Sequence, residues 1–143
     1  MKIADILRTK GSAVVTISPE QPIQVAMRVL VEHNIGALVV VDGRLRGIIT
    51  ERDMLRTAAA DVRRLESARV EDLMTVEVIT TSPAADINHV MDVMTERRIR
   101  HLPVVDAGGV CGIISIGDVV NAMRQHVEAE NRHLHAYITG IPL

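Results

Sequence analysis

The sequence predicts an α+β fold in which two tandem β-α-β-β-α repeats pack sheet to sheet about a pseudo-twofold axis. The segment Val14–Pro19 recurs 64 residues later as Val78–Pro83, and the same spacing carries the apolar residues that follow. A short motif also occurs twice, at Gly47–Asp53 and Gly112–Asp118: glycine, two β-branched apolar residues, a hydroxyl residue, two further residues and aspartate. A unit of about sixty residues buries too little surface to fold well alone, so the two copies should share a core.

The elements of the first repeat follow in order from its residues. Val14–Ile17 is a short strand, and a helix begins near Pro22, where proline suits a first turn. The apolar residues of this helix recur at helical spacing: Ile23, Ala26, Met27 and Leu30. Two strands joined by a turn at Asp42-Gly43 come next, over Ala37–Val41 and Leu45–Ile49. A second helix opens at Thr50, and in the second repeat Pro103 suits an edge strand or a strand start.

Two segments lie beyond these elements. Val62–Asp72 is rich in charge, and we interpret it as a solvated helix end and linker. Val119–Ile138 is predicted to be a long helix with apolar residues near heptad spacing. We expect no metal there, because His133 and His135 lie on different faces and no cysteine or carboxylate cluster completes a zinc site. The chain then divides into a first repeat with an N-terminal segment, a second repeat, and a C-terminal helix extension with a tail: residues 1–66, 67–125 and 126–143.

Composition narrows the classes of function. A net charge of -2 gives no electrostatic reason to bind nucleic acid, and Tyr137 is the only aromatic residue, so bases lack stacking partners. The longest apolar run, Ala37–Val41, is far too short to cross a membrane, and the first residues carry charge too early for a signal peptide. The lone Cys111 excludes an internal disulfide and is interpreted as a packed apolar residue. We expect a cytoplasmic protein that binds neither nucleic acid nor membrane.

The first helix carries more apolar surface than one core needs. Val25 and Val29, beside Val31, form a second apolar row next to the core stripe. This row could meet a second copy of the chain in a C2 homodimer, or it could cover the neighbouring repeat. We expect the chain to form a homodimer.

The repeated motif places a hydroxyl and a carboxylate where a strand runs into a helix. Thr50 with Asp53, and Ser115 with Asp118, have the spacing of a capping box, which by itself only starts a helix. The same corner can hold a sugar diol on its side chains and an anion near the unpaired N–H groups of the first turn. Recurrence at one place in a longer repeat favours the binding interpretation.

Tandem β-α-β-β-α repeats closed by this motif resemble the CBS (cystathionine β-synthase) domain pair, often called a Bateman module. The resemblance covers about residues 2 to 125. It implies two clefts between the sheets that bind adenosine-containing ligands such as AMP, ADP, ATP, NAD or S-adenosylmethionine. It also implies that ligand binding shifts the geometry of the module and regulates a partner protein.

The resemblance implies a role for individual residues. Asp53 and Asp118 would accept hydrogen bonds from the ribose hydroxyls of their clefts, and Thr50 and Ser115 would contact the sugar or first phosphate. The adenine wall would come from the opposite repeat. Facing the second motif would be Thr16, Ile35, Gly36 and Ala37, and facing the first would be Thr80, Ile99 and Arg100.

Phosphate contacts would fall to three basic side chains, namely Arg52, Arg100 and His101. The clefts are not equivalent, because Glu51 would repel phosphate in the first if it points inward, and the second has Ile116-Gly117 where a cation could stand. The alternative for the basic segment Glu96–Arg100 is a helix end that complements the helix dipole.

The sequence therefore favours a non-catalytic, adenosine-nucleotide-binding module that senses energy or metabolite state and regulates a partner protein. The alternative is a ligand-free dimerisation or protein-interaction scaffold. Catalysis is not indicated, because we find no nucleophile with a base beside it and no glycine-rich phosphate loop. No cofactor is expected beyond the adenosine-containing ligand.

Overall fold

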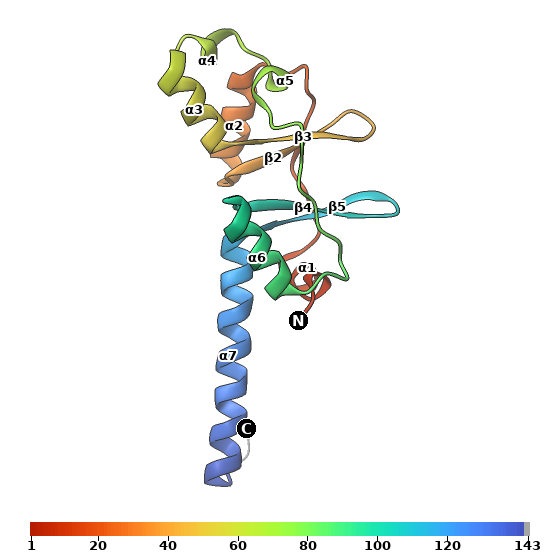
Figure 1. The fold of residues 1–143 in the computed structure, drawn as a ribbon, viewed down its shortest axis with the longest axis vertical. Helices are drawn as coiled ribbons and strands as arrows, with labels where there is room; N and C mark the ends of the chain where they lie inside the picture. The colour runs from red at the N-terminus through yellow and green to blue at the C-terminus, as the bar shows by residue number, and fades with distance from the viewer. Residues whose placement is uncertain (142–143) are drawn as a thin grey trace.

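The computed structural model describes residues 1–141, so residues 142 and 143 of the predicted tail lie outside the described residues. Two small sheets lie next to each other in the middle of the molecule, with helices on their outer sides (Figure 1). The predicted α+β fold of two tandem repeats is confirmed. The order of elements is α1 (Ile3–Lys10), β1 (Thr16–Ile17), α2 (Ile23–His33), β2 (Ala37–Val41), β3 (Leu45–Thr50), α3 (Glu51–Asp61), α4 (Arg64–Ser67), α5 (Val70–Leu73), α6 (Ile87–Arg97), β4 (His101–Asp106), β5 (Gly109–Ser115) and α7 (Ile116–Thr139).

The two sheets differ by one strand. In the first repeat β1 pairs in parallel with β2, and β2 pairs antiparallel with β3. The second repeat has only the β4–β5 hairpin, and the predicted strand at Val78–Thr81 is reduced to a parallel bridge between Thr81 and Val104. In the first repeat the Val39 N–H donates to the Val15 carbonyl at 3.4 Å. Pro103 stands at the corresponding place and has no N–H to donate, so this strand is not extended.

The sequence predicted one core shared by the two copies, but each repeat has its own apolar core. Each core includes residues from the segment that precedes the other repeat, which is how the two copies complete one another. Ile3 and Ile6 of α1 are buried in the core of the second repeat, with Ile87 and Leu102. The core of the first repeat takes in Ala68, Val70 and further residues around α5. Backbone hydrogen bonds attach each segment to the repeat on which it packs. The Ile3 N–H donates to the Ala85 carbonyl at 3.0 Å, and the Ile23 N–H donates to the Ala68 carbonyl at 2.9 Å. The two segments therefore exchange places between the repeats.

The linker interpretation of Val62–Asp72 is partly wrong. Its charged side chains are exposed for the most part, as expected for a solvated segment. However, it contains α4 and the start of α5, and Val70 is fully buried. The segment is thus part of the first repeat's core rather than a simple connection.

The second apolar row of α2 is partly buried and partly exposed. Val25 and Val29 are half-buried and pack against the core of their own repeat. Val31 remains 80% exposed. The row therefore supplies core contacts within the first repeat and leaves one large apolar side chain on the surface.

The long C-terminal helix is confirmed and begins three residues earlier than predicted, at Ile116. Its first turns pack on the second repeat, where Val119 and Ala122 are buried. The remainder extends away from the two sheets (Figure 1). The helix thus has an anchored beginning and a long projecting part.

Candidate functional site

Both copies of the motif form complete capping boxes. The backbone N–H of Thr50 donates to Asp53 Oδ2 at 2.9 Å, and the Asp53 N–H donates to Thr50 Oγ1 at 3.2 Å. In the second copy Ser115 N–H donates to Asp118 Oδ2 at 2.8 Å, and Asp118 N–H donates to Ser115 Oγ at 3.2 Å. The capping role is therefore real at both corners. It uses Oδ2 of each carboxylate and leaves Oδ1 for other partners.

The first N–H group of each helix is also paired. The Glu51 N–H donates to the Gly36 carbonyl at 3.0 Å, and the Ile116 N–H donates to the Arg100 carbonyl at 2.8 Å. With the caps, two of the first three N–H groups of α3 and of α7 are used within the chain. Each helix start therefore has fewer unpaired N–H groups to offer an anion than the sequence suggested. Any anion bound here must rely mainly on side chains.

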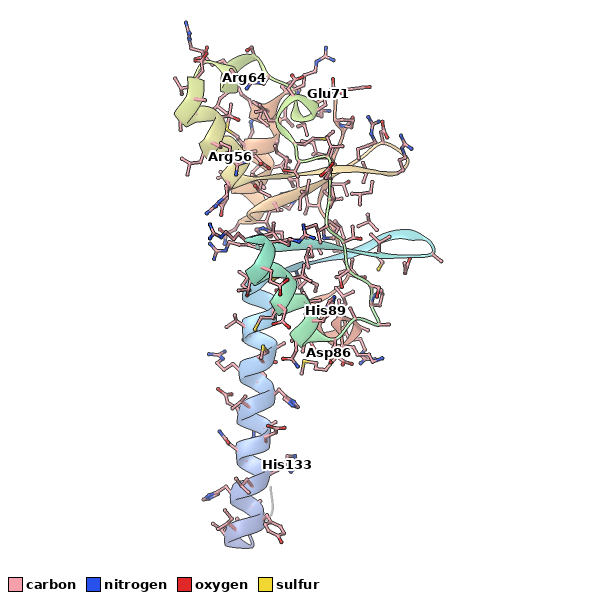
Figure 2. All side chains as sticks on the ribbon, in the orientation of Figure 1. Arg56, Arg64, Glu71, Asp86, His89 and His133 are labelled. Carbon is pink, nitrogen blue, oxygen red and sulfur yellow. The ribbon has the colours of Figure 1, made fainter. Side chains whose placement is uncertain are left out.

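The two aspartates have different neighbours. Asp53 is 8% exposed, and Arg56 of α3, labelled in Figure 2, lies 3.8 Å from its Oδ1. Asp118 receives Lys10 from α1, whose Nζ lies 2.6 Å from Oδ2 and 2.7 Å from the Ile113 carbonyl oxygen. Sequence reasoning missed Lys10, because the N-terminal segment was assigned to the first repeat. The corner of the second motif thus already holds a cation from its own chain.

The Lys10 contact affects the ionisation of Asp118. Burial is the largest influence and raises the pKa of this carboxyl, but the hydrogen bonds from Lys10 and Ser115 outweigh it, and the pKa ends below its ordinary value of 3.8. The charged form is therefore favoured by folding. The resulting stability is present above the ordinary pKa and is lost as the pH falls through the lowered one.

The variant Lys10→Met should lower the free energy of unfolding at pH 7 by about 1 kcal/mol, because a partly exposed, charge-assisted pair is lost. The difference from wild type should shrink below about pH 3.8, where the carboxyl of the unfolded chain is protonated. Urea unfolding at pH 7 and at pH 3 measures this. Lys2→Met is the matched control and should change little at either pH. An equal loss for Lys10→Met at both pH values would contradict the ion pair.

His101 lies at the contact between the repeats. A Cβ built on Gly36 would lie 3.2 Å from His101 Cε1 and 3.3 Å from Glu51 Oε1, so these three residues meet at one point. Burial lowers the pKa of His101, although the nearby carboxylate of Glu51 opposes the shift. The ring therefore favours its neutral form near pH 7. Glu51 points toward this contact, and His101 is better suited to a neutral hydrogen bond than to neutralising a phosphate.

An open cleft of about 490 Å³ lies where the two repeats meet. One wall carries Arg52 from the start of α3, and the other runs from the end of α6 into β4 and includes Arg98 and Arg100. The remaining lining residues are mostly apolar, namely Met94, Thr95, Ile99 and Ile116. The cleft thus combines three arginine residues with an apolar surface.

Arg98 was not among the predicted site residues. It ends α6 in the left-handed conformation with φ 54°, and Asn34 does the same for α2 with φ 51°. Asparagine is common at such a position and arginine is not, and the conformation costs an arginine about 1 kcal/mol or more. Comparison of Arg98 with Asn34 in the aligned repeats was the signal that could have identified it. A side chain kept at a strained position beside a cleft suggests a role in the cleft.

The structure gathers some of the predicted residues and not others. Arg52, Ile99 and Arg100 line the cleft together, as proposed for the first site, and Gly36 meets His101 nearby. Thr50 and Asp53 cap α3 and do not line the cleft, and Thr80 is exposed outside it. Of the wall predicted for the second site, Thr16 is exposed in β1, Ile35 packs on the first core and Ala37 is buried. The binding roles of all these residues remain predictions.

Within residues 1–141 no three histidine, cysteine, aspartate or glutamate side chains gather as metal ligands would. None of the helices in the same range combines the length and the apolar character needed to span a bilayer.

Known proteins resemble the chain along most of its length. The chain is 38% identical to the mitochondrial CBS domain-containing protein CBSX3 of Arabidopsis thaliana, over 96% of this chain and 72% of that protein. It is 36% identical to the CBS domain-containing protein YhcV of Bacillus subtilis, over 85% of this chain and 87% of that protein.

Solved structures agree with these relatives. The CBS-domain protein ATU1752 of Agrobacterium tumefaciens superposes with a TM-score of 0.83 at 39% identity, over 86% of this chain and 99% of that one. The CBS domain pair of protein MJ0100, solved with 5'-methylthioadenosine and S-adenosylmethionine, superposes with a TM-score of 0.77 at 30% identity, over 88% and 98%. The family model for the CBS domain matches twice, at residues 3–60 and 70–125. The chain therefore belongs to the CBS domain family, as a tandem pair of CBS domains.

Proposed function

We propose that this CBS domain pair is a non-catalytic regulatory module that binds an adenine nucleotide in the cleft lined by Arg52, Arg98 and Arg100. The observation that carries the proposal is that three arginines, contributed by both repeats, line one open cleft. Guanidinium groups bind phosphate through paired, charge-assisted hydrogen bonds. The cleft volume of about 490 Å³ lies in the usual range for small-molecule sites.

The apolar part of the cleft suits a purine. Ile99 and Ile116 offer aliphatic surface, and the only aromatic residue of the chain, Tyr137, lies near the end of α7. The bound adenosyl ligands of the MJ0100 pair support the same class of ligand here. Among such ligands, three arginines favour those that carry phosphate, such as AMP, ADP, ATP or NAD, over the positively charged sulfonium of S-adenosylmethionine.

A ligand in this cleft would connect the repeats. Because Arg52 comes from the first repeat and Arg100 from the second, a bound phosphate stabilises one relative arrangement of the two over others. This change in geometry is the means by which the module would regulate a separate protein, with the module itself acting as a homodimer. The single thiol of Cys111 suits a reducing compartment such as the cytoplasm.

The first test is thermal unfolding with a panel of ATP, ADP, AMP, NAD, S-adenosylmethionine and 5'-methylthioadenosine. A ligand at one hundred times its Kd should stabilise the fold by about 2.7 kcal/mol. We expect a rise in Tm of several degrees with at least one phosphate-bearing ligand, and a smaller rise with the two sulfur compounds. Unchanged melting curves across the panel would contradict the proposal.

A second candidate function is a ligand-free scaffold for protein interaction. The Lys10 side chain favours it for the second motif, since its ammonium group occupies Asp118 Oδ2, where a ribose was expected. Melting curves that respond to no ligand, together with pull-down of a specific protein, would favour the scaffold.

A further inference from the structure

The projecting part of α7 carries several large apolar side chains that the rest of the chain does not cover. The helix has 24 residues, about 36 Å at 1.5 Å per residue, and only its first turns pack on the second repeat. Figure 2 labels His133 on the part that extends away from the sheets. Its large apolar side chains are more than half exposed: Val127 52%, Leu134 57%, Tyr137 88% and Ile138 72%.

These apolar residues follow a heptad. Val120, Val127 and Leu134 are each seven residues apart, and Met123, Glu130 and Tyr137 fall at the intermediate positions. Met123 also packs on the core of the second repeat, so the part of the seam beyond that core begins at Val127. A spacing of 3.5 residues keeps one seam facing a partner helix along its length, whereas packing onto a globular surface follows 3.6. Glu130 is the polar exception, and such a residue within a seam sets register at a cost in stability. The pattern is that of a coiled-coil strand without its partner.

The charges of this part of α7 favour a second copy of the same helix as its partner. Between Arg124 and Thr139 two arginines, Arg124 and Arg132, balance two glutamates, Glu128 and Glu130, and no lysine is present. A membrane surface or a nucleic acid would call for a net positive face. A neutral helix can lie against an identical one without net repulsion, and an identical seam is always available in a C2 dimer.

We infer that residues 120–139, which run to the end of α7, form a two-stranded coiled coil with the same segment of a second copy of this chain. An isolated helix of this length is marginal in water, so pairing also explains how the projecting part stays helical. The CBS family model ends at residue 125, so most of this seam lies beyond the matched domains. The inference does not depend on the nucleotide cleft, and it assigns the homodimer to α7 rather than to the apolar row of α2.

The test compares two substitutions at adjacent positions. Leu134→Glu places a charge in the seam, and His135→Glu places the same charge beside it, outside the heptad. Light scattering after gel filtration, repeated over a range of concentrations, gives the mass in solution. We expect wild type and His135→Glu to be dimers of a 15.7 kDa chain, and Leu134→Glu to need at least tenfold more protein to dimerise.

A second measurement locates the contact directly. In a Cys111→Ser background, Val127→Cys should oxidise to a disulfide-linked dimer if the helices run parallel. An equal mixture of Val120→Cys and Tyr137→Cys chains should form a mixed disulfide-linked dimer if they run antiparallel, because residue 120 then faces residue 137 while Val127 faces Glu130, and either result supports the inference. A monomeric wild type would overturn it, as would a dimer that Leu134→Glu leaves intact and no cysteine links. A monomer that binds vesicles of anionic lipid would assign the seam to a membrane and overturn it as well.

Discussion

Replacing Gly47 with alanine should lower the free energy of unfolding by about 2–3 kcal/mol, the usual cost of overpacking a well-filled site. The new Cβ would lie 2.7 Å from the Thr75 carbonyl oxygen and 2.8 Å from Met74 Sδ. The carbonyl cannot move freely, because Thr75 O accepts from the Ile48 N–H at 3.0 Å and Thr75 N–H donates back to Ile48 O at 2.9 Å. Urea unfolding at pH 7 measures the effect.

Two further glycines provide the comparison. The Cβ of Gly112→Ala would lie 2.7 Å from Leu7 Cδ2, but this is the end of a side chain that can rotate, so the loss should be clearly smaller. Gly117→Ala lies in the first turn of α7 with its nearest neighbour at 3.6 Å, and it should raise stability by at most about 0.5 kcal/mol, because helix propensity counts less there than in a helix interior. Equal losses at Gly47 and Gly112 would show that the Thr75 backbone is not the rigid obstacle.

Removing two guanidinium groups from the cleft should weaken adenine-nucleotide binding by roughly 100-fold or more. Hydrogen bonds to a charged group are worth about 1.5–3 kcal/mol each, and each 1.4 kcal/mol is a factor of ten. The variant is Arg98→Gln with Arg100→Gln, since both residues line the cleft. Isothermal titration with the nucleotide that gives the largest rise in Tm measures the change.

Controls separate binding from folding in this experiment. Arg97→Gln changes the neighbouring arginine at the end of α6, outside the lining residues, and should leave affinity within about twofold. Arg98→Gly should weaken binding and yet raise stability by about 1 kcal/mol, because glycine accepts the left-handed conformation without strain. Affinity that falls equally in Arg97→Gln and in the double variant would place the phosphate elsewhere.

Much of the fold could be predicted because the repeat appears twice in one chain. The hairpin turn at Asp42-Gly43 and the capping boxes at Thr50 and Ser115 follow from local patterns that recur in the two copies. The length of α7 has no counterpart in the first copy and follows from its own apolar spacing. The reason why the second repeat lacks a strand is visible in the sequence as Pro103, which has no backbone N–H. Its effect could not be predicted, because it depends on which neighbouring strand that N–H would face. That direction becomes known only with the register of the sheet.

The parts of the site that sequence reasoning missed depend on contacts between distant segments. Lys10 reaches Asp118 because α1 packs on the second repeat, which no local pattern around residue 10 reveals. His101 and Gly36 were predicted site residues, but their contact with each other and with Glu51 was not foreseen, because it arises only where the two hairpins face each other. Arg98 differs from these, since its place at a helix end in register with Asn34 made it visible in principle.

The exchange of α1 and α5 between the repeats bears on how the chain can be divided. Cutting it near residue 66 would leave the amino-terminal fragment without the buried Val70 and the carboxyl-terminal fragment without the buried Ile3. Each fragment would have a gap in its interior that only the other could fill. We therefore expect that neither repeat folds alone. A destabilising substitution in one repeat should lower the unfolding temperature of both.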